Sequence, residues 1–227
     1  MAHRSWTGPG SLLNGRVRTL GKALRRRERL APAAREKLDV RTHSKLDRKL
    51  AIVYTDTDDF TVRVARHGMM HFLMSFARAV RGLRPIVARQ RGRLVKVEAD
   101  SLLLVFPDVT RACRAVIAMA AALERLNRGK PESERVEFSF GIGFGAMLDL
   151  GKDVLGLEVN LASKLGEDRA RRGEILLTQA AVAALPPALR ARLEPGGEVE
   201  FTGRPMKVVR LAGLNAPAPR RPRRASP

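Results

Sequence analysis

The sequence predicts a mixed α/β (α+β) domain whose elements follow the order strand, helix, strand, strand, helix, strand. Two kinds of pattern predict this order. Short runs rich in apolar and β-branched residues, bounded by acidic or turn-forming residues, are typical of strands. Longer stretches in which apolar residues recur every three or four positions are typical of helices that pack one face on a sheet. With 227 residues, 44% of them apolar, the chain is long enough to bury one sizeable core.

The first strand is predicted at residues 50–54 (Leu-Ala-Ile-Val-Tyr), and an acidic loop at 55–61 follows it. The first helix is predicted at residues 69–90, because apolar residues repeat there at helical spacing. These residues are Met70, Leu73, Met74, Ala77, Val80 and Leu83. Gly92 marks the expected stop, and we expect Pro85 to bend the helix or to end its regular part.

Two β-rich runs at residues 93–98 and 101–106 predict a hairpin with an acidic tip, and Asp100 lies at that tip. The second helix is predicted at residues 110–128, ending near Gly129. Its expected packing face consists of Ala112, Val116, Met119, Ala120 and Leu123. We expect this helix to serve packing and not chemistry.

The last strand of this series is predicted at residues 135–146, where residue types alternate with period two, and a turn is expected at 147–152. Within the strand, Gly141, Gly143 and Ala146 satisfy a dinucleotide-binding pattern. That motif needs a strand before it and a helix after it, which is not the predicted arrangement. We therefore expect the glycines to let backbone or a nucleotide approach the strand closely.

The net charge of +20 is unevenly spread along the chain. Residues 1–48 contain thirteen Lys and Arg against four Asp and Glu, a net of +9, and residues 214–227 add four Arg and no acid. We therefore divide the chain into a basic, partly helical N-terminal extension (1–48), a central domain (49–213) and a Pro/Arg-rich tail (214–227). The composition of the tail is typical of a disordered segment.

Within the extension, Leu20, Leu24 and Leu30 lie at roughly helical spacing among Lys and Arg, which predicts a short amphipathic basic helix. Three interpretations of this charge stay open. The extension is a solvated or mobile arm, a contact to acidic lipid headgroups, or a contact to nucleic acid.

The rest of the composition indicates a cytoplasmic protein. No run approaches the roughly 20 apolar residues that a membrane span needs, and the start of the chain lacks the apolar region of a signal peptide. The single cysteine, Cys113, permits no internal disulfide and is expected to be a buried small hydrophobe. Contact with a membrane surface would then be peripheral, through the basic extension.

Two aspartates, Asp56 and Asp100, each lie at the end of an apolar strand-like run. Carboxylate oxygens suit Mg²⁺, which takes few protein ligands and completes its shell with water and substrate phosphates. Taken singly, either aspartate could be a turn residue. Together they indicate a metal site for a nucleotide.

Three motifs agree in order and spacing with a known family. Asp56 is followed four residues later by Phe-Thr, and Lys96 precedes Asp100 by four positions. In the third motif, Asp153 is followed by Gly at the third position and then by Val-Asn, a small pair and a cation, over residues 153–164. With these motifs the chain from about 49 to 213 resembles the catalytic domain of class III adenylate and guanylate cyclases, whose core has the ferredoxin-like βαββαβ plan.

The resemblance implies a two-metal reaction. Asp56, Asp100 and the backbone carbonyl of Thr57 would hold two Mg²⁺ or Mn²⁺ ions per site. Lys96 and Asp153 correspond to the pair that recognises the purine, and an ammonium donor with a carboxylate acceptor suits adenine. The implied activity is conversion of ATP to 3′,5′-cyclic AMP and pyrophosphate.

The resemblance assigns further roles on the substrate. Asn160 corresponds to the residue that orients the ribose, and Arg204 falls where the family often places a cation for the terminal phosphates. Lys164 takes the place where many members carry an arginine that stabilises the transition state. The family builds each site from two protomers, so a chain with all these residues implies a homodimer.

Two residues depart from the family pattern. Lys164 keeps a positive charge but lacks the planar bidentate fork of arginine, so we expect reduced turnover. Asp59 stands where the family often has glycine and would repel the triphosphate unless its carboxylate points away or helps to bind metal. The alternatives are therefore a weak or inactive cyclase-like module that binds nucleotide or a partner, and a cyclase for another nucleoside triphosphate.

A zinc site is a weaker alternative. His67 and His71 are four residues apart at the start of the first predicted helix, a spacing that places both on one helical face. No third ligand follows at a sensible spacing. We expect both histidines to be surface or cap residues.

Overall fold

The computed structural model describes residues 15–57, 59–170 and 172–212, without the side chains of residues 168 and 169. The predicted tail at 214–227 lies outside the described residues. So does the start of the N-terminal extension, up to residue 14.

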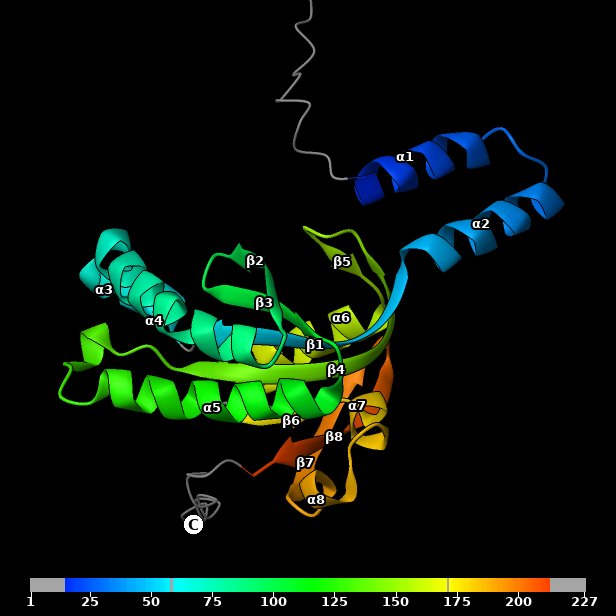
Figure 1. Cartoon of the computed structure of the whole chain (residues 1–227). Helices are drawn as coiled ribbons and strands as arrows, with labels where there is room; N and C mark the ends of the chain where they lie inside the picture. Colours follow the sequence, from blue (N-terminus) through cyan, green and yellow to red (C-terminus); the bar gives the residue numbers. More distant parts are fainter. Residues whose placement is uncertain (1–14, 58, 171, 213–227) are drawn as a thin grey trace, which may run out of the picture.

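One twisted sheet forms the centre of the molecule (Figure 1). Its strands lie in the order β2-β3-β1-β4-β6-β8-β7, and the short β5 pairs with β4. The strands are β1 (Asp47–Thr57), β2 (Arg93–Glu98), β3 (Ser101–Phe106), β4 (Phe138–Asp149), β5 (Val154–Leu155), β6 (Ile175–Leu177), β7 (Leu193–Phe201) and β8 (Arg204–Leu211). All neighbours are antiparallel except β4 and β6.

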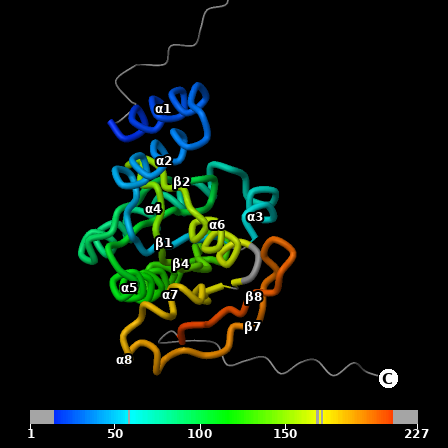
Figure 2. The backbone as a smooth tube through the Cα atoms, turned by 90° about the vertical axis from the view of Figure 1, so that its right-hand side faces the viewer, coloured from blue at the N-terminus to red at the C-terminus, as the bar shows by residue number. Residues whose placement is uncertain are grey.

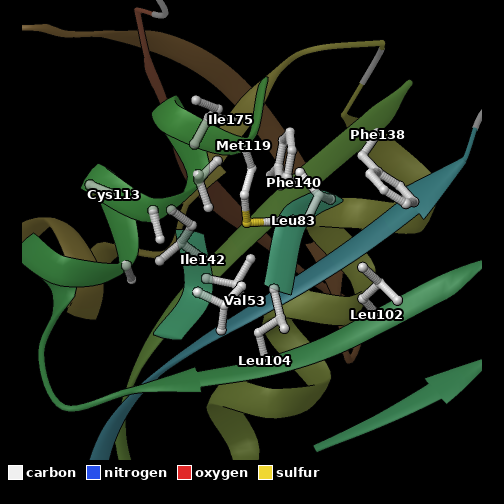
Figure 3. Close-up of a cluster of buried hydrophobic side chains, with 14 of the residues drawn as sticks. Val53, Leu83, Leu102, Leu104, Cys113, Met119, Phe138, Phe140, Ile142 and Ile175 are labelled. Atoms are coloured by element: carbon white, nitrogen blue, oxygen red, sulfur yellow. The ribbon is translucent and has the colours of Figure 1, made fainter. Parts of the chain in front are cut away.

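The two long helices cover one face of this sheet. They are α4 (Met69–Arg89) and α5 (Val109–Asn127). Apolar side chains of both helices meet alternate residues of the central strands, such as Val53 of β1, Leu104 of β3 and Ile142 of β4 (Figure 3). Each of these three is at most 1% exposed. This cluster is the main core.

Shorter helical segments complete the molecule. They are α3 (Phe60–His67), α6 (Leu157–Lys164), α7 (Gln179–Ala183), α8 (Pro187–Arg190), the 3₁₀ turn η1 (Glu132–Glu134) and the π-helical turn η2 (Leu165–Arg169). Of these, α6 packs on the face of β1 and β4 opposite to α5, over a second, smaller apolar cluster that includes Ile52, Leu103 and Ala162.

The N-terminal extension forms two helices, α1 (Gly15–Arg27) and α2 (Pro32–Leu46), which pack on each other and lead directly into β1 (Figures 1 and 2). The basic helix predicted around residues 20–30 is therefore present, whereas α2 was not predicted. Pro32 begins α2, a position where its missing N–H is harmless. None of the helices within the described residues has the length and apolar character of a membrane-spanning segment.

The predicted order of elements is confirmed by β1, α4, β2, β3, α5 and β4. Three details of the prediction were wrong. The predicted loop at 55–61 contains the end of β1 and the start of α3, and β4 continues to Asp149, so the turn begins only at Leu150. In the first half of α4, the predicted residues Met70, Leu73, Met74 and Ala77 are exposed, because the helix buries the neighbouring face instead. That face consists of Phe72, Ser75, Phe76, Ala79, Val80, Leu83 and Val87.

Pro85 lies inside α4 and does not end it. A proline removes one helical hydrogen bond, that to the carbonyl four residues earlier, here Arg81. Both Pro85 and Arg81 are exposed, so water can replace the lost donor. The helix therefore continues for another turn.

Candidate active site

The two predicted metal aspartates lie at the same end of the sheet, Asp56 on β1 and Asp100 in the β2–β3 turn. β1 and β3 are antiparallel with Thr55 opposite Leu102, which places the end of β1 beside the β2–β3 turn. The hydroxyl of Thr57 donates a 2.5 Å hydrogen bond to the carboxylate of Asp100. One residue earlier, the carboxylate of Asp56 accepts a 3.2 Å hydrogen bond from the Ser101 hydroxyl.

This pair of carboxylates fits the metal chemistry expected of it. Asp100 is 9% exposed and Thr57 is 3% exposed, so their oxygens are held in place by the surrounding sheet. The described residues contain no group of three or more His, Cys, Asp or Glu side chains that could hold a metal ion. Two carboxylates with backbone carbonyls are nevertheless a suitable donor set for Mg²⁺, whose remaining ligands are commonly water and substrate phosphates.

The proposed purine residues meet in a separate pocket of about 480 Å³. Its lining includes Tyr54, Lys96, Glu98, Leu103, Asp153, Val154, Leu155, Gly156, Val159, Asn160 and Ser163. The ammonium of Lys96 lies 3.3 Å from the Asp153 carboxylate and 2.8 Å from that of Glu98. The hydrogen bond to Glu98 raises the pKa of Lys96 most, burial lowers it, and Asp153 raises it further. Lys96 is therefore a fully charged donor.

The structure brings Lys96, Asp153 and Asn160 together but leaves other predicted residues outside this pocket. Asp56, Asp100 and Lys164 do not line it. Arg204 begins β8, which is separated from β1 by β4 and β6. One chain thus presents two separate groups of predicted residues, the carboxylate pair and the pocket that holds Lys96, Asp153 and Asn160.

Asp59 adopts a left-handed backbone conformation with φ of 64°, immediately before α3. Glycine adopts this conformation without steric cost, which gives a physical reason for glycine at this position. The Asp59 carboxylate forms an ion pair with Arg172, which also lies 3.6 Å from Glu137. The extra negative charge is thus partly neutralised by a cation from the segment before β6.

The glycines of β4 serve helix packing. A Cβ atom on Gly141 would lie 2.0 Å from the carbonyl oxygen of Ala162, and one on Gly143 would lie 2.6 Å from that of Glu158. Both neighbours belong to α6, so the glycines let this helix approach the sheet. The close approach of backbone that the sequence predicted is therefore confirmed, and the pattern lies within a strand as expected.

The two histidines and the single cysteine lie outside the pocket described above. His71 Nε2 lies 3.0 Å from the Ser133 carbonyl oxygen, and the rings of His67 and His71 are 5.6 Å apart. Cys113 is fully buried, and burial raises the pKa of its thiol to about 12. The exposed His67 agrees with the expected surface role, and the buried Cys113 agrees with the expected packing role.

Sequence reasoning missed several contacts of the site. Glu98 competes with Asp153 for Lys96, and Ser101 binds Asp56. Ser101 could have been noticed because it directly follows Asp100. Tyr54 lines the purine pocket, and its burial, together with a hydrogen bond to Glu167, raises its pKa to about 12.

Comparisons with known proteins address the fold. No family model matches the chain. A serine/threonine-protein kinase, pkn2 of Myxococcus xanthus, is 30% identical over 68% of this chain and 18% of the relative. A putative adenylate cyclase 3 of Rhizobium meliloti (strain 1021) is 25% identical over 52% of this chain and 20% of the relative. The chain thus spans about a fifth of the length of these curated relatives.

Solved structures match most of the chain. The adenylyl cyclase CyaB from P. aeruginosa matches with a TM-score of 0.63 and 19% identity, covering 74% of this chain and 96% of that structure. The guanylyl cyclase Cya2 matches with a TM-score of 0.62 and 18% identity, covering 76% and 96%. Because both kinds of cyclase match equally well, the fold does not decide the nucleotide. The chain therefore has the fold of the class III adenylyl/guanylyl cyclase catalytic domains.

Proposed function

We propose that this domain is an adenylate cyclase that converts ATP to 3′,5′-cyclic AMP and pyrophosphate at the interface of a homodimer. The observation that carries this proposal is the meeting of Lys96, Asp153 and Asn160 in one pocket. Asp153 and Asn160 lie 57 and 64 positions after Lys96 in the sequence. The fold therefore brings the predicted purine and ribose contacts together.

In the proposed reaction the ribose 3′-oxygen attacks the α-phosphorus, the bond to the bridging oxygen breaks, and pyrophosphate leaves. The proton of the 3′-hydroxyl is released as the new ester bond forms. Asp56, Asp100 and the Thr57 carbonyl would hold Mg²⁺ or Mn²⁺. When bound, the metal ions lower the pKa of the hydroxyl and bind the triphosphate charge. The protein itself supplies position and charge.

Specificity for adenine rests on hydrogen-bond polarity. The Lys96 ammonium can donate to a ring nitrogen, and the Asp153 carboxylate can accept from the exocyclic amine. Guanine presents an oxygen at its sixth position and would face the carboxylate with an acceptor. Asn160 orients the ribose, and Lys164 contributes positive charge at the α-phosphate.

The homodimer is supported by the separation of the two groups of predicted residues and by exposed apolar residues beside the purine pocket. Val97, Leu155 and Leu157 are 47%, 46% and 63% exposed. Leu155 lines the pocket, and the other two lie next to residues that do. Covering such residues with a second protomer is favourable, at about 25 cal/mol per Å² of apolar surface. We propose that the partner supplies the carboxylate pair.

The second candidate is a cyclase-like module with little or no catalysis, and Lys164 is the observation that favours it. A lysine makes a point contact where arginine makes two parallel hydrogen bonds. If Lys164 limits an otherwise intact site, Lys164→Arg should raise turnover with little change in KM. An unchanged absence of turnover in Lys164→Arg would favour the binding module. A third candidate is a cyclase for another nucleoside triphosphate.

The proposed substrate favours a cytoplasmic location, where ATP is available. The basic residues of α1 that point to solvent include Arg18, Lys22, Arg25 and Arg26. Their contact with an acidic membrane surface or with nucleic acid stays a prediction. Neither is needed for the proposed reaction.

The first experiment is incubation of the purified protein with ATP, GTP, CTP or UTP and Mn²⁺, followed by mass spectrometry of the products. Cyclic AMP is expected from wild type and not from Asp56→Asn. Glu200→Gln, which replaces an exposed carboxylate in β7, is the control and should also produce cyclic AMP. A different cyclic nucleotide would overturn the base assignment alone. No product from a folded dimer would favour the binding module.

The shared site is tested by mixing two inactive variants, Asp56→Asn and Asn160→Ala, under conditions of subunit exchange. Half of the dimers are then mixed, and each mixed dimer has one site with both native residues. About a quarter of wild-type activity should return, as an isologous dimer with two composite sites requires. No recovery would show that each chain uses its own residues.

A further inference from the structure

Asp149, at the end of β4, joins three separate segments of the chain. Its carboxylate accepts a 2.5 Å hydrogen bond from Arg16 of α1 and a 2.9 Å hydrogen bond from Arg93 of β2. The same carboxylate accepts a 2.8 Å hydrogen bond from the backbone N–H of Gly151. Arg16 also donates to the backbone carbonyl of Asp149, at 3.3 Å.

The turn that follows Asp149 carries Asp153, one of the two proposed purine residues. It connects β4 to β5 in four residues, and Gly151 within it has φ of 82°. The N–H of Leu150 donates to the Asp153 carbonyl at 2.9 Å, which closes the turn. Asp149 thus binds one end of a tight turn whose other end presents Asp153 to the pocket.

The other purine residue, Lys96, lies on β2 three residues after Arg93. The same two segments are therefore joined twice, by Arg93 with Asp149 and by Lys96 with Asp153. Arg93 also donates to the Gly151 carbonyl. The side chain of Asp149 is 11% exposed, whereas that of Asp153 is 39% exposed, so the first ion pair is the better shielded of the two.

We propose that Asp149, held by Arg93 and Arg16, positions the base-recognising pair Lys96 and Asp153. Helix α1, through Arg16, thereby contributes to recognition of the purine. This inference rests on the proposed function, since it concerns how the same pocket distinguishes adenine from guanine. Asp149 and its two arginines are positioning residues, because they act on the base through Lys96 and Asp153.

The arrangement favours the charged form of Asp149. Burial by itself would raise its pKa, but the Gly151 N–H and the two guanidinium groups lower the pKa below its ordinary value. A charged, multiply hydrogen-bonded carboxylate fixes its donors more firmly than a neutral one. Removing Arg16 leaves Arg93 in place, so the turn should loosen without losing its fold.

The test uses the full chain with Arg16→Ala and Arg93→Ala, and Arg18→Ala as the matched control. Arg18 lies on the same helix, is exposed, and loses the same charge when replaced. Hydrogen–deuterium exchange of the segment 149–155 is measured without nucleotide. Affinities for non-cyclisable ATP and GTP analogues are then measured with Mn²⁺ by calorimetry.

In Arg16→Ala and Arg93→Ala we expect faster exchange of the turn and a lower ATP-to-GTP affinity ratio. The ratio should fall about threefold for Arg16→Ala and about tenfold for Arg93→Ala, the range typical of mutations that act through coupled contacts. Arg18→Ala should match wild type in both measurements. A general loss of stability would lower both affinities together and leave the ratio unchanged.

Unchanged exchange or an unchanged affinity ratio in Arg16→Ala, with a wild type that binds nucleotide, would overturn this inference and leave the proposed function intact. A wild type that binds neither nucleotide would overturn both. If Arg93→Ala does not fold, the partly exposed Arg16 still provides the test, since its side chain is 40% exposed.

Discussion

Thr57 donates its hydroxyl hydrogen to the carboxylate of Asp100 across 2.5 Å, although the two residues are 43 positions apart. The bond connects the end of β1 to the β2–β3 turn and fixes one of the two proposed metal ligands before any metal arrives. The Asp56 carboxylate is fixed in a similar way by Ser101. Hydroxyl groups therefore hold the two carboxylates of the proposed metal site in place, as hydrogen-bond partners commonly do for metal ligands.

Thr57→Val should destabilise the protein, because it removes this donor while keeping the side-chain shape. A buried acceptor left without its partner typically costs about 1 to 3 kcal/mol. Asp100→Asn should keep most of the stability, since an amide oxygen still accepts from Thr57, but should lose Mn²⁺ affinity. Urea unfolding measures the first effect and electron paramagnetic resonance of free Mn²⁺ the second. Equal Mn²⁺ binding by Asp100→Asn and wild type would remove Asp100 from the metal site.

Gly141→Ala should destabilise the domain severely. The added Cβ would lie 2.0 Å from the Ala162 carbonyl oxygen and 2.8 Å from the Gly166 nitrogen, and neither backbone atom can move alone. We expect a loss above about 3 kcal/mol, beyond ordinary overpacking, or no folded protein. Gly145→Ala on the same strand is the control, since its Cβ meets only the Glu158 side chain, at 3.0 Å. Similar unfolding midpoints for the two variants would contradict the packing role of Gly141.

Much of this fold was predictable because local patterns and tertiary packing agree. The apolar run at 50–54 is the buried centre of β1, and α5 buries most of its predicted face. Prediction failed where one helix offered two apolar faces. In α4, the exposed Met70 and Met74 fit the helical period as well as Phe72 and Phe76 do, and only contact with the sheet selects the latter pair.

The candidate site was predictable to the extent that it lies in short motifs. Asp56, Asp100 and Asp153 each stand within a local pattern that the sequence displays. The contacts that hold these aspartates and their neighbours in place are not part of any local pattern. Arg16 and Asp149 are 133 residues apart, and nothing in the sequence around either residue indicates its partner. The same holds for Arg172 and Asp59, which are 113 positions apart.

Tyr54 should ionise at about pH 12 in the folded protein, since burial and then its hydrogen bond to Glu167 raise its pKa from 10.0. It is the chain's single tyrosine, so absorbance at alkaline pH reports on it alone. Between the two pKa values the unfolded chain binds fewer protons, and this contribution to stability therefore falls as pH rises from about 10 to about 12.

Tyr54→Phe is the control for this pH dependence. It should remove the absorbance change and lessen the fall in stability above pH 10, because no phenol remains to ionise and only other groups such as the Cys113 thiol still contribute. In urea, the wild-type phenol should return to an ordinary midpoint of about 10. A midpoint near 10 in the native protein would show that the Tyr54 phenol is accessible to water in the pocket that it lines.

Asp59→Gly should increase both stability and nucleotide affinity. Glycine relieves a left-handed conformation, φ 64°, that is unfavourable for residues with a Cβ, by about 1 kcal/mol. It also removes a negative charge from the loop that the resemblance places beside the triphosphate. Arg172→Ala should have the opposite effect on affinity, because Asp59 loses the cation with which it pairs.

The two changes are best measured as a double-mutant cycle of ATP affinity, with Arg18→Ala as a control for the loss of one positive charge elsewhere. In the Asp59→Gly background, Arg172→Ala should weaken binding much less than in wild type, because the charge that Arg172 neutralises is gone. Both effects should shrink at high salt, since the pair is exposed to solvent. Additive effects would mean that Arg172 acts on the phosphates directly, and Asp59 would then be a residue that the site tolerates without compensation.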